Sequence, residues 1–382
     1  MNREDRADQK LTIAHFMPWS GVGGVEIATV RMVEATKDRF RHVVFCLDDA
    51  SSLMDSFEKL GVETVTYAPP EPSLRHGIRF YKESRAVARQ LQAVGADVVH
   101  FSETKAAYHN SLAALLVRSR MMCHVRNTYP DVSLREKLTL LPVHRFIFVS
   151  YEAKRHFGVS MPDEKARVIY DAIEIPATDM AASNAAVRRE LGIPSECTVV
   201  GMVARVNPQK DYFTLTSAAA EVLRKHPDTR FLVVGDNSFV DLNRRHYEEV
   251  VNKLNELGIA DKFVFTGHRN DVSRLIAAMD ISVLSTHREG FGLCIAESMA
   301  MRKPVVATAV GGLLEVVEHG VTGYLHQHGN SKELADAIIE LIDDPERANQ
   351  LGLAGCEHVR QNYSGEKFVG EISKAYSDVM RT

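Results

Sequence analysis

Two glutamates frame a glycine-rich stretch whose residue types suit a phosphate group and a sugar. Glu289 and Glu297 stand eight residues apart, with Gly290 and Gly292 between them. The stretch follows an apolar run and opens a helical pattern, so the glycines leave backbone N–H groups unobstructed at a helix N-terminus, where anions bind. We expect Glu289 in the loop and Glu297 on the helix, where it could accept hydrogen bonds from hydroxyl groups. Taken singly, each acid could also be an ordinary residue of a helix start or a helix surface.

Two cations precede another helical pattern. Arg205 and Lys210 stand five residues apart in a loop that follows an apolar run. Arginine offers a planar fork of donors and lysine a point charge, so together they suit a diphosphate. The alternative is a solvated basic loop, since lysine and arginine are common on surfaces.

Two glycine pairs stand at further turns between a strand pattern and a helix pattern. Gly23 and Gly24 permit close approach of a phosphate or a sugar to the backbone. Glu26 departs from the dinucleotide-binding fingerprint, which requires glycine or alanine at that position. Gly311 and Gly312 indicate either another binding loop or only a turn. Both interpretations stay open for each pair.

These loops depend on the elements before and after them. Short apolar runs alternate with amphipathic stretches along the chain, a pattern typical of α/β folds with parallel sheets. The predicted strands are 11–17, 41–47, 63–67, 97–101, 198–206, 230–234, 263–266, 281–285 and 304–309. The predicted helices are 25–35, 52–60, 80–94, 212–225, 241–257, 272–279, 293–301 and a short one at 313–318, with a mostly helical tail over 332–380.

The alternation weakens between residues 171 and 190, which indicates a domain boundary. We expect a disordered lead over residues 1–10 and two Rossmann-like, doubly wound domains over 11–175 and 190–360. A final helix over 361–382 is expected to pack back on the N-terminal domain. Ligands of such sheets bind beyond the carboxyl ends of the strands, so the two domains would face a central cleft.

The composition sets limits on the function. The 382 residues are 45% apolar and carry a net charge of −4, so a globular protein is expected and nucleic acid is not an expected partner. The five cysteines are scattered without a C-x-x-C pair, which suits the cytoplasm and argues against a zinc site. Residues 1–10 lack the pattern of a signal peptide, and no apolar run is long enough for a transmembrane helix.

Membrane contact would therefore be peripheral. The candidate for it is a basic stretch beside Phe80 and Tyr81, comprising Arg75, His76, Arg79 and Lys82. This stretch could touch an anionic membrane or a lipid-linked acceptor. It could instead be the solvated start of a helix, and we do not count it as a site.

Taken together, these motifs resemble the family-4 retaining glycosyltransferases of GT-B fold over nearly the whole chain. The most specific part is the stretch from Glu289 to Glu297, which matches the family's two spaced glutamates around a Gly-Phe-Gly core. The Arg205 and Lys210 pair, the Thr266-Gly267 turn and the stretch 304–323 follow in the family's order.

The resemblance implies a role for each matching position. It implies that Arg205 and Lys210 hold the diphosphate of the donor, that Glu289 lies by the donor sugar and that Glu297 holds the ribose hydroxyls. Backbone N–H groups would cap the phosphate and sugar at Phe291, Gly292 and Leu293, and Gly23 and Gly24 would close over the donor from the other domain. No metal is implied, and these loops lack the Asp-x-Asp pair of metal-dependent transferases.

The acceptor side departs from the family pattern. Asp171-Ala172 stands where the junction between the domains is often Asn-Gly. Arg126 stands where a histidine is often found, with His124 two residues earlier, and is our acceptor-side candidate for catalysis. His100 matches a strand that ends in histidine, but Ser102 replaces the second histidine often found there. The roles of His100 and His124 stay open.

The resemblance implies transfer of a sugar from a nucleotide-sugar, a UDP-sugar, to an acceptor hydroxyl with retention at the anomeric carbon. No cofactor beyond this donor is implied. The expected setting is the synthesis of a polysaccharide, glycolipid or glycosylated metabolite in the cytoplasm, including the inner face of the membrane. Three alternatives stay open: an NAD-dependent oxidoreductase, a sugar-nucleotide epimerase and a non-catalytic sugar-nucleotide-binding protein. The oxidoreductase rests on the Gly23-Gly24 loop and on Asp48, which follows the second predicted strand.

Overall fold

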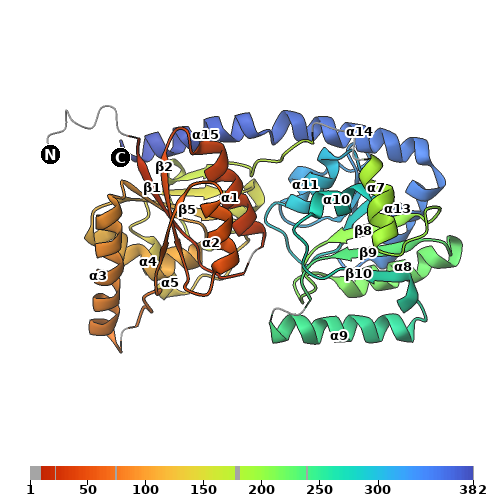
Figure 1. Ribbon diagram of the computed structural model, residues 1–382, viewed down its shortest axis with the longest axis horizontal. Coiled ribbons are helices and arrows are strands. Elements are labelled where there is room, and N and C mark those ends of the chain that lie inside the picture. The colour runs from red at the N-terminus through yellow and green to blue at the C-terminus, as the bar shows by residue number, and fades with distance from the viewer. Residues whose placement is uncertain (1–9, 22, 74, 177–180, 238–239, 382) are drawn as a thin grey trace. The chain divides into compact units, whose positions relative to one another are not determined.

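The computed structural model describes residues 10–21, 23–73, 75–176, 181–237 and 240–381. The chain divides into two compact units, each described here by itself. The N-terminal unit comprises Met1–Ala172 and Gly365–Thr382, and the C-terminal unit comprises Ile173–Ser364. Figure 1 shows both, coloured along the chain. Nearly all of the lead predicted over residues 1–10 lies outside the described residues.

A parallel sheet of seven strands forms the centre of the N-terminal unit, in the order β3-β2-β1-β4-β5-β6-β7. Its strands are β1 Thr12–Phe16, β2 Arg41–Cys46, β3 Glu63–Thr66, β4 Val98–Phe101, β5 Arg120–Val125, β6 Arg145–Phe148 and β7 Ala166–Val168. Its helices are α1 Gly24–Thr36, α2 Ser51–Glu58, α3 Gly77–Val94, α4 Thr104–Leu116, α5 Leu134–Leu140, α6 Tyr151–Arg155 and α15 Gly365–Val379, with a 3-10 turn at Asp163–Lys165.

The last helix, α15, belongs to the core of the N-terminal unit. It packs beside α1, with its residues Phe368, Ile372 and Tyr376 buried in one cluster with Ile13 of β1 and Met32 of α1. The final helix begins at Gly365, four residues later than the predicted 361, because residues up to Asn362 continue the preceding helix. The N-terminal unit is therefore formed by two separate segments of the chain.

A parallel sheet of six strands forms the centre of the C-terminal unit, in the order β10-β9-β8-β11-β12-β13. Its strands are β8 Val199–Val203, β9 Arg230–Val234, β10 Phe263–Phe265, β11 Ile281–Leu284, β12 Val305–Thr308 and β13 Tyr324–His326. Its helices are α7 Ala181–Glu190, α8 Tyr212–Lys225, α9 Asp241–Glu256, α10 Val272–Ala277, α11 Leu293–Ala300, α12 Leu313–Val316, α13 Ser331–Asp343 and α14 Pro345–Asn362, with a 3-10 turn at Ala260–Lys262. This unit begins before α7, not at residue 190, because α7 packs on α10.

The prediction of two doubly wound α/β sheets with a helical tail is confirmed. The structure adds β5, β6, β7 and β13, for which no strand was predicted. β7 and β13 have only three residues each, so their apolar runs are short in the sequence, whereas β5 and β6 carry apolar runs that were not assigned to strands. Among the described residues, no helix is long and apolar enough to cross a membrane.

Candidate active site

Two loops at the carboxyl ends of β8 and β11 are bonded to each other in the C-terminal unit. Lys210 and Thr286 form an antiparallel bridge. The Asp211 N–H donates to the Ser285 carbonyl at 3.0 Å, and the His287 N–H donates to the Gln209 carbonyl at 3.0 Å. Two segments far apart in the sequence are thereby held as one surface at the end of the sheet where ligands of α/β folds bind.

An ion pair joins two of the predicted site residues across these loops. The Lys210 ammonium lies 2.5 Å from a carboxylate oxygen of Glu289, and their side chains are 14% and 18% exposed. A part-buried ion pair of this length fixes both side chains more firmly than a pair on an open surface. The structure thus brings the predicted phosphate ligand and the predicted sugar-side acid into direct contact.

The glycine pair Gly311-Gly312 supports the loop that carries Glu289. The Gly312 N–H donates to the Glu289 carbonyl at 3.1 Å. A Cβ atom on Gly311 would lie 1.9 Å from that carbonyl oxygen, and one on Gly312 would lie 2.2 Å from the Gly290 carbonyl oxygen. Gly311 also has φ of +53°, where residues with side chains are disfavoured. Only glycine at these two positions leaves room for the loop that carries Glu289. The Gly311-Gly312 turn therefore supports that loop.

The start of α11 is shaped by Gly292, which precedes the helix with φ of +99°. A Cβ atom there would lie 2.5 Å from the Leu313 side chain. Phe291 is buried, and its ring meets Tyr363 edge-on with centroids 5.1 Å apart. Leu293 and Glu297 are half-buried on the helix that follows. Backbone N–H groups at this helix start suit an anion.

Arg205 stands apart from this cluster. It is exposed in the loop after β8, where a neighbouring bond from the Val206 N–H to the Asp236 carbonyl, 2.8 Å long, holds the backbone. Within the described residues, no hydrogen bond or ion pair joins Arg205 to Lys210 or Glu289. The guanidinium is thus available to a ligand, and the predicted convergence with Lys210 on one anion stays a prediction.

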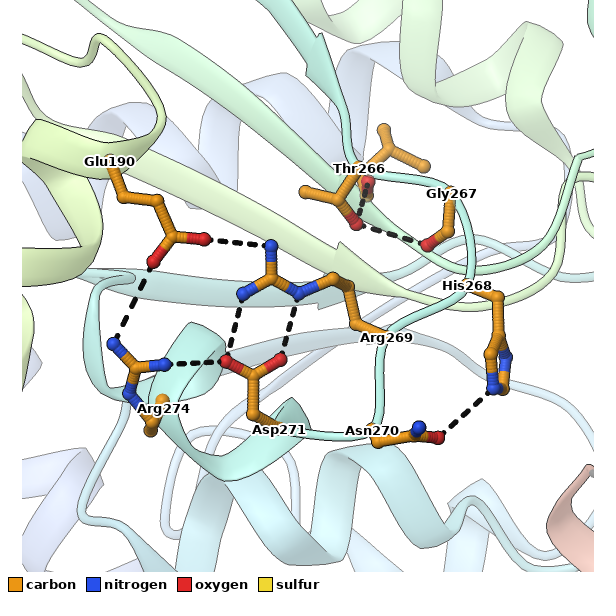
Figure 2. A network of polar contacts seen from close by, with 9 residues as sticks. Glu190, Thr266, Gly267, His268, Arg269, Asn270, Asp271 and Arg274 are labelled. Atoms are coloured by element: carbon orange, nitrogen blue, oxygen red, sulfur yellow. Dashed lines mark hydrogen bonds and ion pairs between the residues drawn. The ribbon is translucent and has the colours of Figure 1, made fainter.

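A polar network lies beyond the Thr266-Gly267 turn (Figure 2). Arg269 makes two 2.8 Å bonds to Asp271 and a third to Glu190 of α7. Arg274 of α10 pairs with the same two acids. Hydrogen bonding from Arg269 lowers the pKa of Asp271 to about 2. The loop after β10 is therefore tied to both helices at the edge of the sheet.

Gly23 and Gly24 stand at the start of α1 in the N-terminal unit. The Gly23 N–H donates to a Glu26 carboxylate oxygen at 2.9 Å, so the Glu26 side chain caps the helix start, and Glu26 is buried. This carboxylate occupies the helix start at which a dinucleotide would place its pyrophosphate. Glu26 is thus explained as a cap, and its negative charge weighs against the oxidoreductase alternative.

Arg126, predicted as a catalytic candidate, is buried. Its guanidinium lies 2.5 Å from Asp171, with side chains 4% and 5% exposed, and reaches His124 Nδ1 at 3.3 Å. The two departures from the family pattern, Arg126 and Asp171, are therefore partners in one ion pair. Such a pair positions the backbone near residue 171 and leaves little of the guanidinium for a substrate.

Glu103 is a candidate that the sequence analysis missed. It is fully buried at the start of α4, where it accepts hydrogen bonds from the Thr104 N–H at 2.9 Å and from the Arg126 N–H and the Asn127 amide, both at 3.3 Å. Burial raises its pKa to about 7. Buried acids with raised pKa values concentrate at functional sites. The available signal was an acid directly after a strand.

Four buried histidines form a row across adjacent strands, comprising His42 of β2, His15 of β1, His100 of β4 and His124 of β5. His15 and His42 are hydrogen-bonded at 2.9 Å, and His100 bonds the Tyr376 hydroxyl of α15 at 2.7 Å. Burial lowers the pKa of His42 to about 4 and that of His100 to about 3. These rings are neutral near pH 7 and join the sheet to the helix above it.

One cluster could offer ligands to a metal ion. Asp211, His287 and His328 place one ligand atom each within 4.8 Å of one another. Two imidazoles and a carboxylate suit a transition metal. These groups already make hydrogen bonds with protein groups. His287 Nδ1 lies 2.6 Å from His328 Nε2, and the Asp211 carboxylate caps α8 by accepting from the Thr214 N–H and hydroxyl.

Comparisons with known proteins agree with this architecture. Residues 22–175 match the family described as Glycosyltransferase Family 4, and residues 183–358 match Glycosyl transferases group 1. The chain is 30% identical over 195 residues to N-acetyl-alpha-D-glucosaminyl L-malate synthase of Bacillus anthracis, covering 51% of this chain and 49% of that protein. It is 34% identical over 209 residues to D-inositol 3-phosphate glycosyltransferase of Corynebacterium aurimucosum, covering 54% and 48%. The matches thus span about half the length of these relatives.

Solved structures share the fold over almost the whole chain. One is Anabaena Alr3699/HepE in complex with UDP and glucose, with a TM-score of 0.85, 23% identity and coverage of 96% of this chain and 99% of that chain. Another is a glycosyltransferase from Rickettsia africae ESF-5, with a TM-score of 0.82, 20% identity and coverage of 98% and 99%.

Two parallel α/β units with glycine-rich loops at the strand ends define the GT-B class of fold. The chain belongs to family 4 of the GT-B glycosyltransferases. The resemblance noted in the sequence is thereby confirmed.

Proposed function

We propose that this chain is a retaining, metal-independent glycosyltransferase that moves a sugar from a UDP-sugar to an acceptor hydroxyl. The observation that carries the proposal is the Lys210–Glu289 ion pair. Glu289 lies in the loop before α11, and the backbone of that loop packs against Gly311 and Gly312. A cation, an acid and the N–H groups at a helix start together suit a phosphorylated sugar.

The proposed reaction uses these groups in distinct ways. Lys210, Arg205 and the N–H groups of Phe291, Gly292 and Leu293 stabilise the negative charge that develops on the departing diphosphate. Glu289 lies beside the sugar, whose anomeric carbon becomes electron-poor, and Glu297 holds the ribose hydroxyls. The acceptor hydroxyl attacks from the face that the diphosphate leaves, and a phosphate oxygen takes its proton.

The N-terminal unit would bind the acceptor, and its Gly23-Gly24 turn would allow close backbone approach of a sugar or phosphate group. The relatives support the donor and acceptor classes: Anabaena HepE has been crystallised with UDP-glucose, and one relative is named for D-inositol 3-phosphate. We place the reaction in the cytoplasm, in the synthesis of a polysaccharide, glycolipid or glycosylated metabolite, because all five cysteines are free.

The test is a screen of nucleotide-sugars for thermal stabilisation, followed by Lys210→Ala with the best ligand. A bound ligand at 100 times its dissociation constant adds about 2.7 kcal/mol. We expect stabilisation by a UDP-sugar that Lys210→Ala loses. The matched control is Lys225→Ala, which removes a lysine paired with Asp343 elsewhere in the same unit. Stabilisation that survives in Lys210→Ala, or that only NAD produces, would refute the proposed site.

Metal independence has its own test, because EDTA should leave the transfer rate unchanged. The charge of the diphosphate is met by Lys210, Arg205 and backbone N–H groups. A rate that EDTA abolishes and manganese restores would contradict this, and His287→Ala and His328→Ala would then be the variants to compare.

A further inference from the structure

An apolar stripe of three leucines lies exposed on α5. Leu134, Leu138 and Leu141 are 74%, 57% and 67% exposed, whereas Leu140 is buried. At 3.6 residues per turn, these three positions fall on one side of the helix, and Leu140 points in a different direction. Leucine is among the residues most often buried, and a contiguous exposed patch of such side chains marks an interaction site.

The stripe is not needed to form α5. The Ser133 hydroxyl accepts from the Glu136 N–H at 3.3 Å, and the Glu136 carboxylate accepts from the Ser133 N–H at 2.8 Å, which is a complete capping box. Leu140 anchors the helix to the unit. The local hydrogen bonds and this single anchor account for the helix, so the three outward leucines are left for a partner.

Basic residues accompany exposed apolar residues on α5 and on α3. Arg135 and Lys137 flank the leucine stripe and are exposed. Both helices pack against α4, so they belong to one layer of the N-terminal unit. The outward side of α3 carries exposed residues at helical spacing: Ile78, Tyr81, Lys82, Arg85 and Arg89.

The charge of this layer is opposite to that of the chain. The segments 77–94 and 134–140 contain six basic and two acidic residues, while the whole chain has a net charge of −4. Both acids are already engaged, Glu83 with Arg79 and Glu136 in the capping box. The leucine stripe of α5 and the outward side of α3, which lie on the two helices that pack against α4 and are here together called the α3–α5 surface, therefore combine apolar and positively charged side chains.

We propose that the α3–α5 surface docks on an anionic lipid bilayer. Leucine and tyrosine side chains would enter the interfacial region while lysine and arginine extend toward lipid phosphates, a combination that a bilayer accommodates and a neutral protein groove does not. The helix α5 begins after β5, whose carboxyl end leads to Arg126 and Asn127. Docking would bring that end of the sheet close to the membrane. If the chain has the proposed function, this position suits a lipid-linked acceptor.

The experiment is sedimentation of the full chain with vesicles of phosphatidylglycerol and phosphatidylcholine, compared with phosphatidylcholine alone. We expect binding only to the anionic vesicles, and weaker binding as salt increases. Replacing Leu134, Leu138 and Leu141 by glutamine should reduce the partition coefficient at least about tenfold. Replacing Lys82, Arg85 and Arg89 by glutamine should reduce both the binding and its dependence on salt.

Matched controls separate the surface from general effects. Leu242→Gln and Leu353→Gln remove leucines that are 61% and 46% exposed in the C-terminal unit and should leave binding unchanged. Melting curves verify that each variant folds. Absence of binding to anionic vesicles at low salt, or undiminished binding by the leucine variant, would overturn the proposal.

The alternative partner for the α3–α5 surface is a second copy of the chain, and the oligomeric state of the protein in solution tests it. A wild-type dimer that the leucine variant converts to a monomer would overturn membrane docking. Failure here is distinguishable from failure of the proposed function, because nucleotide-sugar binding is measured without vesicles and depends on Lys210 of the C-terminal unit.

Discussion

At the scale of single residues, Glu297 and Glu289 occupy different places on one short stretch. Glu297 lies on α11, half-buried, at the position proposed for the ribose hydroxyls. Such contacts are equal in the ground and transition states, so Glu297→Gln should raise the Michaelis constant of the donor about tenfold and leave turnover nearly unchanged. Steady-state kinetics with varied donor measures this. A fall in turnover at an unchanged Michaelis constant would move Glu297 to the reacting centre.

A second residue-scale prediction concerns Arg126. Removing one partner of a buried ion pair leaves an uncompensated charge, so Arg126→Met should lower the free energy of unfolding by about 3–5 kcal/mol. Adding Asp171→Asn should restore a large part of that loss. Urea unfolding of the single and double variants measures both values. If Arg126→Met is as stable as the wild type and only loses activity, the guanidinium acts on the substrate.

At the scale of elements, the turn at Gly311 supports the Glu289 loop through the backbone. Gly311→Ala would place a Cβ against the Glu289 carbonyl and should reduce turnover at least about tenfold, since about 1.4 kcal/mol of lost positioning has that effect. Gly320→Ala is the control, because Gly320 also has a positive φ, +75°, but its Cβ would meet nothing within 4 Å. Assays and melting curves of both variants separate positioning from backbone strain. Equal losses of turnover in the two variants would refute the supporting role.

The histidine row predicts how stability depends on pH. Burial places the pKa of His42 at about 4 and that of His100 at about 3, below the ordinary 6.5, so the unfolded chain binds more protons as the pH falls. Stability should therefore fall between about pH 6.5 and 4, by about 1.4 kcal/mol per pH unit for each such group. Glu103 acts in the opposite direction above its ordinary pKa, but it is one group against several.

Unfolding of His42→Gln between pH 4 and 7 tests the row. The variant should show a shallower dependence on pH than the wild type, whereas His76→Gln, an exposed histidine of the same unit, should match the wild type. An unchanged slope in His42→Gln would mean that the buried rings do not set the acid sensitivity.

The sequence predicts elements well where local signals suffice. α8 was predicted at its observed bounds because Asp211 caps an amphipathic pattern, and β9 because an apolar run lies between turn residues. β7 was missed because three half-buried residues carry no periodic signal. The Lys210–Glu289 and Arg126–Asp171 pairs join residues 79 and 45 positions apart, so they depend on which strands are neighbours, which local patterns do not reveal. The role of Gly311 likewise depends on a contact made by another loop.

At the scale of the whole molecule, the two units have sheets of the same class but different polar groups. The C-terminal unit holds a cation and an acid over glycine turns, which suits a phosphorylated donor. The N-terminal unit holds the buried Arg126–Asp171 ion pair and a row of buried histidines, and the last helix of the chain packs onto it. The central claim is that the donor sugar reacts beside Glu289 of the C-terminal unit.

The most direct test of that claim is the rate of UDP release from the UDP-sugar that stabilises the protein most, at saturating donor, for Glu289→Gln and the wild type. Loss of a few kcal/mol of transition-state stabilisation predicts a fall of about 100-fold with an unchanged melting temperature. Glu318→Gln, at an exposed glutamate of the same unit, should keep the wild-type rate. Full turnover by Glu289→Gln with several acceptors would contradict the account.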